Sequence, residues 1–119
     1  MGEMSGQIET FPDQRPARRT VWFSRAEFDT LLSLYGRMVA SGVCRDYAVA
    51  DTPDAAVFAM FRRASEQPLY AVEKRPALAQ RQGAWVVIGM GGRVLRRGRD
   101  LRQVLDVLER ALLRLVRSD

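Results

Sequence analysis

The sequence of 119 residues contains no histidine and a single cysteine, Cys44. The absence of histidine removes the commonest general base, the commonest metal ligand and the side chain that titrates near pH 7. One cysteine can form neither an internal disulfide nor a thiolate cluster for zinc or iron–sulfur, and this usage fits a reducing compartment. We therefore expect neither a metal nor a cofactor, and these absences argue against an enzyme.

Long apolar runs are also missing. No stretch approaches the ~20 apolar residues that a membrane-spanning helix needs. Residues 1–19 lack the apolar centre of a signal peptide. We expect a cytoplasmic protein that does not contact a membrane.

The composition is that of a soluble globular protein, with 47% hydrophobic and 28% charged residues. The length suits one domain. Residues 1–19 hold glycine, serine and proline but few residues that form a core, which predicts a flexible N-terminal tail. We place a single domain at residues 20–117.

The clearest local pattern lies at the start of that domain. Ser24 and Glu27 have the spacing of a capping box, which begins a helix. Gly42 is suited to ending that helix. Between them, apolar residues recur at the spacing of one helical face, namely Phe28, Leu31, Leu32, Tyr35, Met38 and Val39.

The middle of the chain alternates short apolar runs with turn residues, which indicates strands. The predicted strands cover residues 47–50, 57–62, 69–74, 85–90 and 93–97. Gly91 and Gly92 predict a two-residue hairpin turn between the last two.

Asp100, with Gln103 three residues later, predicts the N-cap of a final helix. Its apolar stripe comprises Leu101, Val104, Leu105, Leu108, Leu112 and Leu115. The expected fold class is α+β: a helix, a four- to five-stranded antiparallel meander sheet, then a C-terminal helix.

Two of the predicted strands, 57–61 and 85–90, are apolar on both faces, which is typical of strands whose two faces are both covered. Either the two helices take opposite faces of the sheet, or both take one face and a second subunit covers the other. The sequence leaves both arrangements open.

Several strings in combination resemble a known family. They are Ser24-Arg-Ala-Glu27, Leu34-Tyr-Gly-Arg-Met-Val39, Arg45-Asp-Tyr-Ala48, Phe61-Arg-Arg-Ala64, Pro68-Leu-Tyr70 and Gln82-Gly83. Together they are similar to a family of small bacterial proteins known only as domain of unknown function 2794, over about 21–116. The resemblance implies a stand-alone cytoplasmic bacterial protein, and it carries no activity, cofactor or catalytic residue.

The net charge of +5 is concentrated near the C-terminal end. Between residues 74 and 102 a single acid, Asp100, opposes eight bases. A basic segment of this kind could attract a polyanion such as nucleic acid. The candidate polyanion-binding residues are Lys74, Arg75, Arg81, Arg93, Arg96, Arg97, Arg99 and Arg102. On a regular strand, Arg93 and Arg97 would share one face.

Other motifs favour structural roles. The run of glycines from Gly89 to Gly92 leads into a predicted strand, so it fits a hairpin turn better than a phosphate loop. Asp46, Asp51, Asp54 and Glu66 lie near turns, where acids hydrogen-bond the local backbone. Cys44 fits inert packing in the core.

Two functions remain. The first is a non-enzymatic protein-interaction or homo-oligomeric module, with an uncovered apolar sheet face as its interface. The alternative is non-specific nucleic-acid binding through the basic segment 74–102. Possible partners are therefore a second copy, another protein or a nucleic acid.

Overall fold

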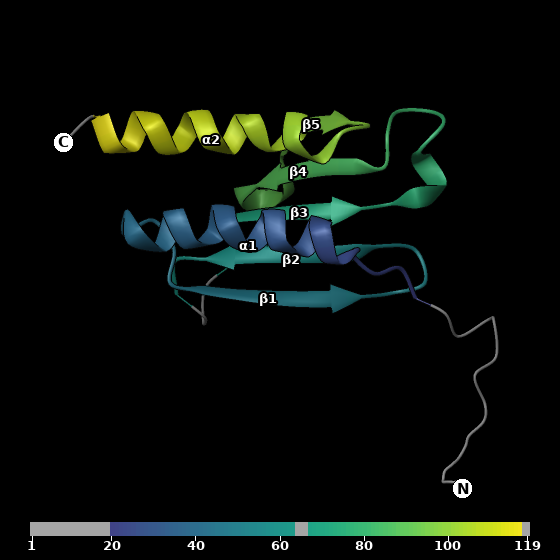
Figure 1. The fold of residues 1–119 in the computed structure, drawn as a ribbon, viewed down its shortest axis with the longest axis horizontal. Coiled ribbons are helices and arrows are strands. Elements are labelled where there is room, and N and C mark those ends of the chain that lie inside the picture. The colour runs from purple at the N-terminus through teal and green to yellow at the C-terminus, as the bar shows by residue number, and fades with distance from the viewer. Residues whose placement is uncertain (1–19, 64–66, 118–119) are drawn as a thin grey trace, which may run out of the picture.

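The computed structural model describes residues 20–63 and 67–117, in which helix α1 leads into a sheet and helix α2 follows it (Figure 1). The sheet order is β1-β2-β3-β4-β5, and every neighbouring pair is antiparallel. This confirms the predicted α+β meander, with five strands. The elements are α1 (Arg25–Ala40), β1 (Asp46–Asp51), β2 (Ala56–Phe61), β3 (Tyr70–Lys74), β4 (Trp85–Gly89), β5 (Val94–Gly98) and α2 (Leu101–Arg117). The predicted tail, residues 1–19, lies outside the described residues, so the domain boundary near Thr20 stays a prediction.

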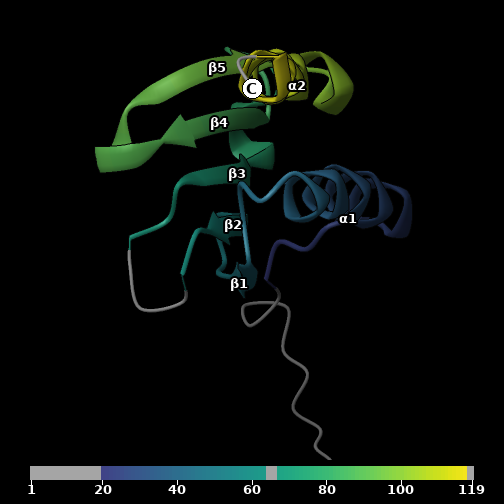
Figure 2. The ribbon, with the colours of Figure 1, turned by 90° about the vertical axis from the view of Figure 1, so that its left-hand side faces the viewer.

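Both helices pack on the same face of the sheet, and no helix covers the other face in the described part of the chain (Figure 2). The core fills the space between the two layers. Leu31 and Leu34 from α1, Phe58 and Val87 from the sheet, and Leu108 from α2 are all at most 1% exposed. Of the two arrangements that the sequence left open, the structure has the one in which both helices take one face.

Helix α1 begins with the predicted capping box. The Ser24 hydroxyl accepts a hydrogen bond from the Glu27 backbone N–H at 3.1 Å, and the Glu27 carboxylate accepts one from the Ser24 N–H at 2.7 Å. Two otherwise unpaired donors of the first turn are satisfied in this way. After the helix, Gly42 adopts a φ of 77°, a conformation that favours glycine and turns the chain away from the helix axis.

We predict that Ser24→Ala lowers the free energy of unfolding by about 1 kcal/mol, because the Glu27 N–H loses its acceptor. Chemical denaturation followed by circular dichroism measures the change. Ser41→Ala is the matched control, since Ser41 flanks the other end of α1 and its side chain forms no hydrogen bond to a described residue. An equal loss in both variants would show that the capping hydroxyl contributes nothing.

Helix α2 also begins as predicted. The Asp100 carboxylate accepts hydrogen bonds from the backbone N–H groups of Arg102 at 2.9 Å and Gln103 at 3.4 Å. The predicted apolar stripe is buried from Leu101 to Leu112, but Leu115 is 48% exposed. The C-terminal half of α2 runs past the end of the sheet (Figure 1), so this part of the stripe has no sheet beneath it.

Candidate functional site

Two of the eight candidate basic residues are engaged in ion pairs. Lys74 Nζ lies 2.7 Å from Glu27 Oε1 and 2.9 Å from the Trp22 carbonyl oxygen, and 5.9 Å from the centre of the Trp85 ring. Arg75 Nε lies 2.8 Å from Glu73 Oε1. These two cations stabilise the fold and contribute little to a positive surface.

The contact with Lys74 also affects the pKa of the Glu27 carboxyl group. Burial on its own raises the pKa of Glu27, but the hydrogen bonds from Lys74 and from the Ser24 backbone, with the charge of Lys74, outweigh it. The pKa of Glu27 is therefore lowered below its ordinary value. A lowered carboxyl pKa stabilises the folded state above the ordinary pKa, and this contribution is lost as the pH falls through the lowered value. The contact that joins α1 to β3 is thus intact at neutral pH.

The other six candidates form no ion pair with any residue in the described ranges. Arg81 and Arg99 lie in loops, and the Arg99 guanidinium donates a hydrogen bond to the Gln80 carbonyl at 3.4 Å. Arg96 and Arg97 belong to the edge strand β5, and Arg102 follows at the start of α2. The basic segment is therefore spread over several surfaces, with Arg93 apart from the rest.

A bulge in β5 separates Arg93 from Arg97. Val87 pairs with Arg96 but Ile88 pairs with Val94, so β5 has one extra residue, Leu95. An extra residue reverses the alternation of side chains beyond it. Arg93 consequently lines a hollow beside α2, whereas Arg97 lies beside Val86 on the face away from the helices. The prediction that these two arginines share a face is wrong.

Acidic residues accompany the arginines at the junction of β5 and α2. Arg96 and Arg102 line a shallow hollow of about 480 Å³ together with Asp100 and Asp106. Asp106 also pairs with Arg110 at 2.8 Å. The two carboxylates reduce the positive field at this position, so the hollow itself is not a strong anion site.

The sheet face opposite the helices carries an unbroken apolar row. Ala48, Ala59, Ala71, Ile88 and Val94 pair in register across all five strands. Their neighbours along the strands, Phe58, Val72 and Val87 among them, point into the core under the helices, so this row faces the other way. The side chains of the row are small on β1 and larger on β5. No described segment covers the row (Figure 2).

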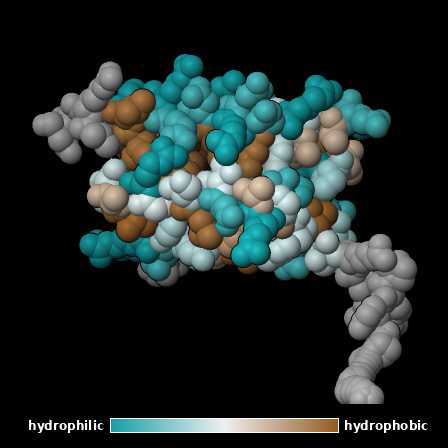
Figure 3. All heavy atoms as spheres, in the orientation of Figure 1, coloured by the Kyte–Doolittle hydropathy of each residue, from teal (hydrophilic) through white to brown (hydrophobic). Residues whose placement is uncertain are grey.

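The helix-bearing side has a different character. Hydrophilic side chains predominate where α2 lies, with apolar side chains scattered between them (Figure 3). Arg37 and Glu109 join the two helices through a bidentate contact of 2.6 and 2.8 Å. The sheet face thus carries one apolar row, while Trp22, Met90 and Leu113 are apolar residues exposed elsewhere. Sequence alternation predicted the strands but not which face stays open.

The predictions for Cys44 and the glycine run agree with the structure. Cys44 is 1% exposed, and burial raises the pKa of its thiol, so it carries little thiolate at neutral pH. Gly91 and Gly92 have positive φ angles of 75° and 81° in the β4–β5 turn. The turn is longer than the predicted two residues, because the Gly89 N–H donates to the Arg93 carbonyl at 2.7 Å.

The acidic residues that the sequence places near turns are described only in part. Asp51 accepts a hydrogen bond from the Thr20 hydroxyl at 2.7 Å, and Glu66 lies outside the described residues. No group of three potential metal ligands occurs in residues 20–63 and 67–117. Neither helix of the described part is long and apolar enough to cross a bilayer.

The chain was also compared with known protein families. Residues 21–105 match the family of proteins of unknown function DUF2794. The chain belongs to this family. The match confirms the resemblance seen in the sequence, and it covers α1 and the whole sheet of the DUF2794 domain together with the first turn of α2. Curated proteins and solved structures yielded no match.

Proposed function

We propose that this DUF2794 protein is a non-enzymatic, cytoplasmic homodimeric module in which the open sheet face packs against the same face of a second copy. The observation that supports this is the apolar row Ala48, Ala59, Ala71, Ile88 and Val94. Ala48 and Val94 at the two ends of the row are exposed, Ala71 and Ile88 are half-buried, and Ala59 is 9% exposed. Apolar residues that are exposed on a sheet face are typical of interaction sites.

The shape of the row favours a second copy as the partner. A two-fold axis parallel to the strands through β3 places β1 of one copy over β5 of the other. Ala48 then faces Val94 of the other copy and Ala59 faces its Ile88, so small side chains meet bulky ones. Two sheets pack in this aligned way about 10 Å apart.

The size of the face sets the expected strength. Five strands about 4.8 Å apart and about 17 Å long present roughly 400 Å² of flat area per copy. Two such faces total roughly 800 Å², which is below the about 1,200 Å² that stable specific interfaces bury and falls in the range of weak, transient contacts. We therefore expect a dimer that dissociates on dilution.

Ala71→Glu tests this proposal, because it places a charge at the centre of the row without enlarging the core. We expect sedimentation velocity over a concentration series to show a monomer–dimer equilibrium for the unaltered protein and only monomer for this variant. Ala26→Glu, an exposed position on α1, is the matched control and retains the dimer. A monomeric unaltered protein at the highest concentration, or a dimeric Ala71→Glu variant, contradicts the proposal.

A second candidate function is non-specific polyanion binding along the β5 edge. The supporting observation is that Arg96, Arg97, Arg99 and Arg102 have no ion pair within the described residues. Replacing Arg96 and Arg97 by Glu should abolish retention on single-stranded DNA at low salt, while Arg93→Glu, on the other side of the bulge, should not. Absence of any DNA binding by the unaltered protein at micromolar concentration excludes this function.

A further inference from the structure

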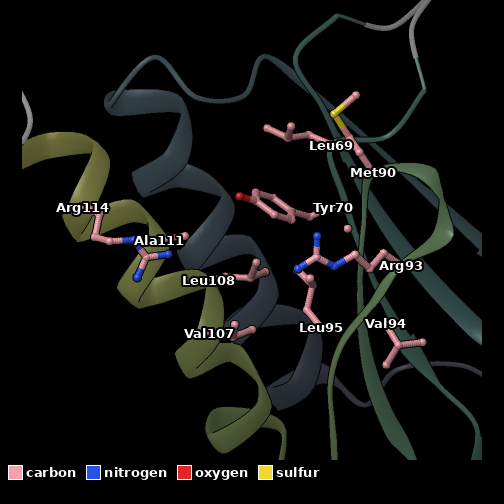
Figure 4. Close-up of a pocket in the computed structure, with 11 residues that line it drawn as sticks. Leu69, Tyr70, Met90, Arg93, Val94, Leu95, Val107, Leu108, Ala111 and Arg114 are labelled. Atoms are coloured by element: carbon pink, nitrogen blue, oxygen red, sulfur yellow. The ribbon is translucent and has the colours of Figure 1, made fainter.

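A cavity lies beside the C-terminal half of α2, which runs past the end of the sheet. Its volume is about 540 Å³, and it lies between α2 and the ends of β3, β4 and β5 (Figure 4). This is within the range of roughly 300–1,000 Å³ that is typical of small-molecule sites. Helix α2 forms one wall of the cavity, and the cavity shares Val94 with the apolar row of the open sheet face.

About half of the cavity wall is apolar. Leu95, Leu108 and Ala111 line it from the sheet and from α2, and Val107 lies beside them (Figure 4). Leu95 is the extra residue of the β5 bulge, so the bulge turns this side chain toward α2. An apolar wall of this kind favours the aliphatic or aromatic body of a ligand over a free inorganic ion.

Three polar side chains also line the cavity. Arg93 reaches in from the start of β5, Arg114 from α2 and Tyr70 from β3 (Figure 4). No described residue forms a side-chain hydrogen bond or an ion pair with any of the three. The described lining contains no acidic side chain that could neutralise the two arginines.

We propose that this cavity binds an amphiphilic anion, a carboxylate or phosphate monoester attached to an apolar body. The guanidinium groups of Arg93 and Arg114 would hold the anionic head, since a planar guanidinium matches carboxylate and phosphate oxygens in a bidentate manner. The Tyr70 hydroxyl would donate a further hydrogen bond. The apolar body would lie against Leu95, Leu108 and Ala111.

Isothermal titration of the full chain with decanoate and with decyl phosphate tests the proposal and distinguishes the two head groups. We expect saturable binding of at least one of them. Decyltrimethylammonium, with the same tail and the opposite charge, and acetate or inorganic phosphate, which lack the tail, should not bind. Binding of neither decanoate nor decyl phosphate, or equal binding of decyltrimethylammonium, overturns the proposal.

Variants of the lining residues test whether the ligand binds in this cavity. The double variant Arg93→Gln with Arg114→Gln should weaken binding by about tenfold or more, since each charged hydrogen bond is lost. Ala111→Phe should abolish binding by filling the cavity while leaving both charges in place. Arg102→Gln, an exposed position on the same helix outside the cavity, is the matched control and should bind like the unaltered protein. Unchanged affinity in the double variant, with its melting temperature preserved, overturns the site.

Discussion

Replacing Phe58 with alanine should lower the free energy of unfolding by about 3–5 kcal/mol. Phe58 is fully buried at the centre of β2. Its ring centre lies 5.9 Å from that of Phe28, 6.3 Å from Tyr35 and 5.1 Å from Tyr47. The truncation therefore removes apolar area, leaves a cavity and ends three aromatic contacts that join α1 to the first two strands.

Phe61→Ala is the matched control for that prediction, because it removes the same atoms from the same strand. Phe61 lies on the open face and is only half-buried, so we expect less than half of the loss. Urea unfolding of both variants under conditions where the protein is monomeric gives the comparison. Equal losses would show that the core under the helices is no better packed than the open face.

Gly83→Ala should cost about 3 kcal/mol or more, although it adds a single methyl group. Gly83 has a φ of 92°, a backbone conformation that residues other than glycine rarely adopt. A Cβ atom there would lie 2.2 Å from both the carbonyl carbon and the oxygen of Gly98. The obstructing atoms belong to the backbone and cannot rotate away as a side chain could. The added methyl group would therefore push the β3–β4 loop away from the end of β5.

Gly36→Ala is the opposite case and serves as its control. Apart from the adjacent residues and the backbone of α1 itself, no atom lies within 4 Å of the position where a Cβ would stand on the exposed side of the helix. Alanine is better than glycine inside a helix, so this variant should be more stable by up to about 1 kcal/mol. Thermal unfolding of both variants should therefore show shifts of opposite sign. A loss at Gly36 or a neutral result at Gly83 contradicts the packing described above.

The sequence predicted the elements that short-range chemistry determines. Ser24 and Glu27 lie three residues apart, and their hydrogen bonds close within one helical turn, so the capping box could be read directly. Asp100 capped α2 for the same reason. Gly91 and Gly92 marked the β4–β5 turn, although its length depends on the Gly89–Arg93 hydrogen bond.

Long-range geometry was beyond the sequence. Which face of the sheet each helix covers depends on residues far apart in the sequence, among them Leu34, Phe58 and Leu108, that pack into one core. No residue type near Leu95 predicts a bulge there. A regular strand without the bulge would place Arg93 and Arg97 on one face. The cavity was missed for a related reason, because Arg114 and Tyr70 lie far apart in sequence and only the packing of α2 brings them together.

The meander order of the sheet has a consequence for folding kinetics. Every strand pairs with its neighbour in the sequence, so the sheet assembles from successive hairpins and no strand has to wait for a distant partner. Low sequence separation between contacting residues is associated with fast folding. The contacts of the helices are the long-range ones. Lys74 on β3 contacts Glu27 on α1, and the contact of Arg37 with Glu109 can form only after α2 has been synthesised. Until α2 has been synthesised, the part of the core face over β4 and β5 lacks its covering helix, and exposed apolar surface of this kind makes a folding chain prone to aggregation.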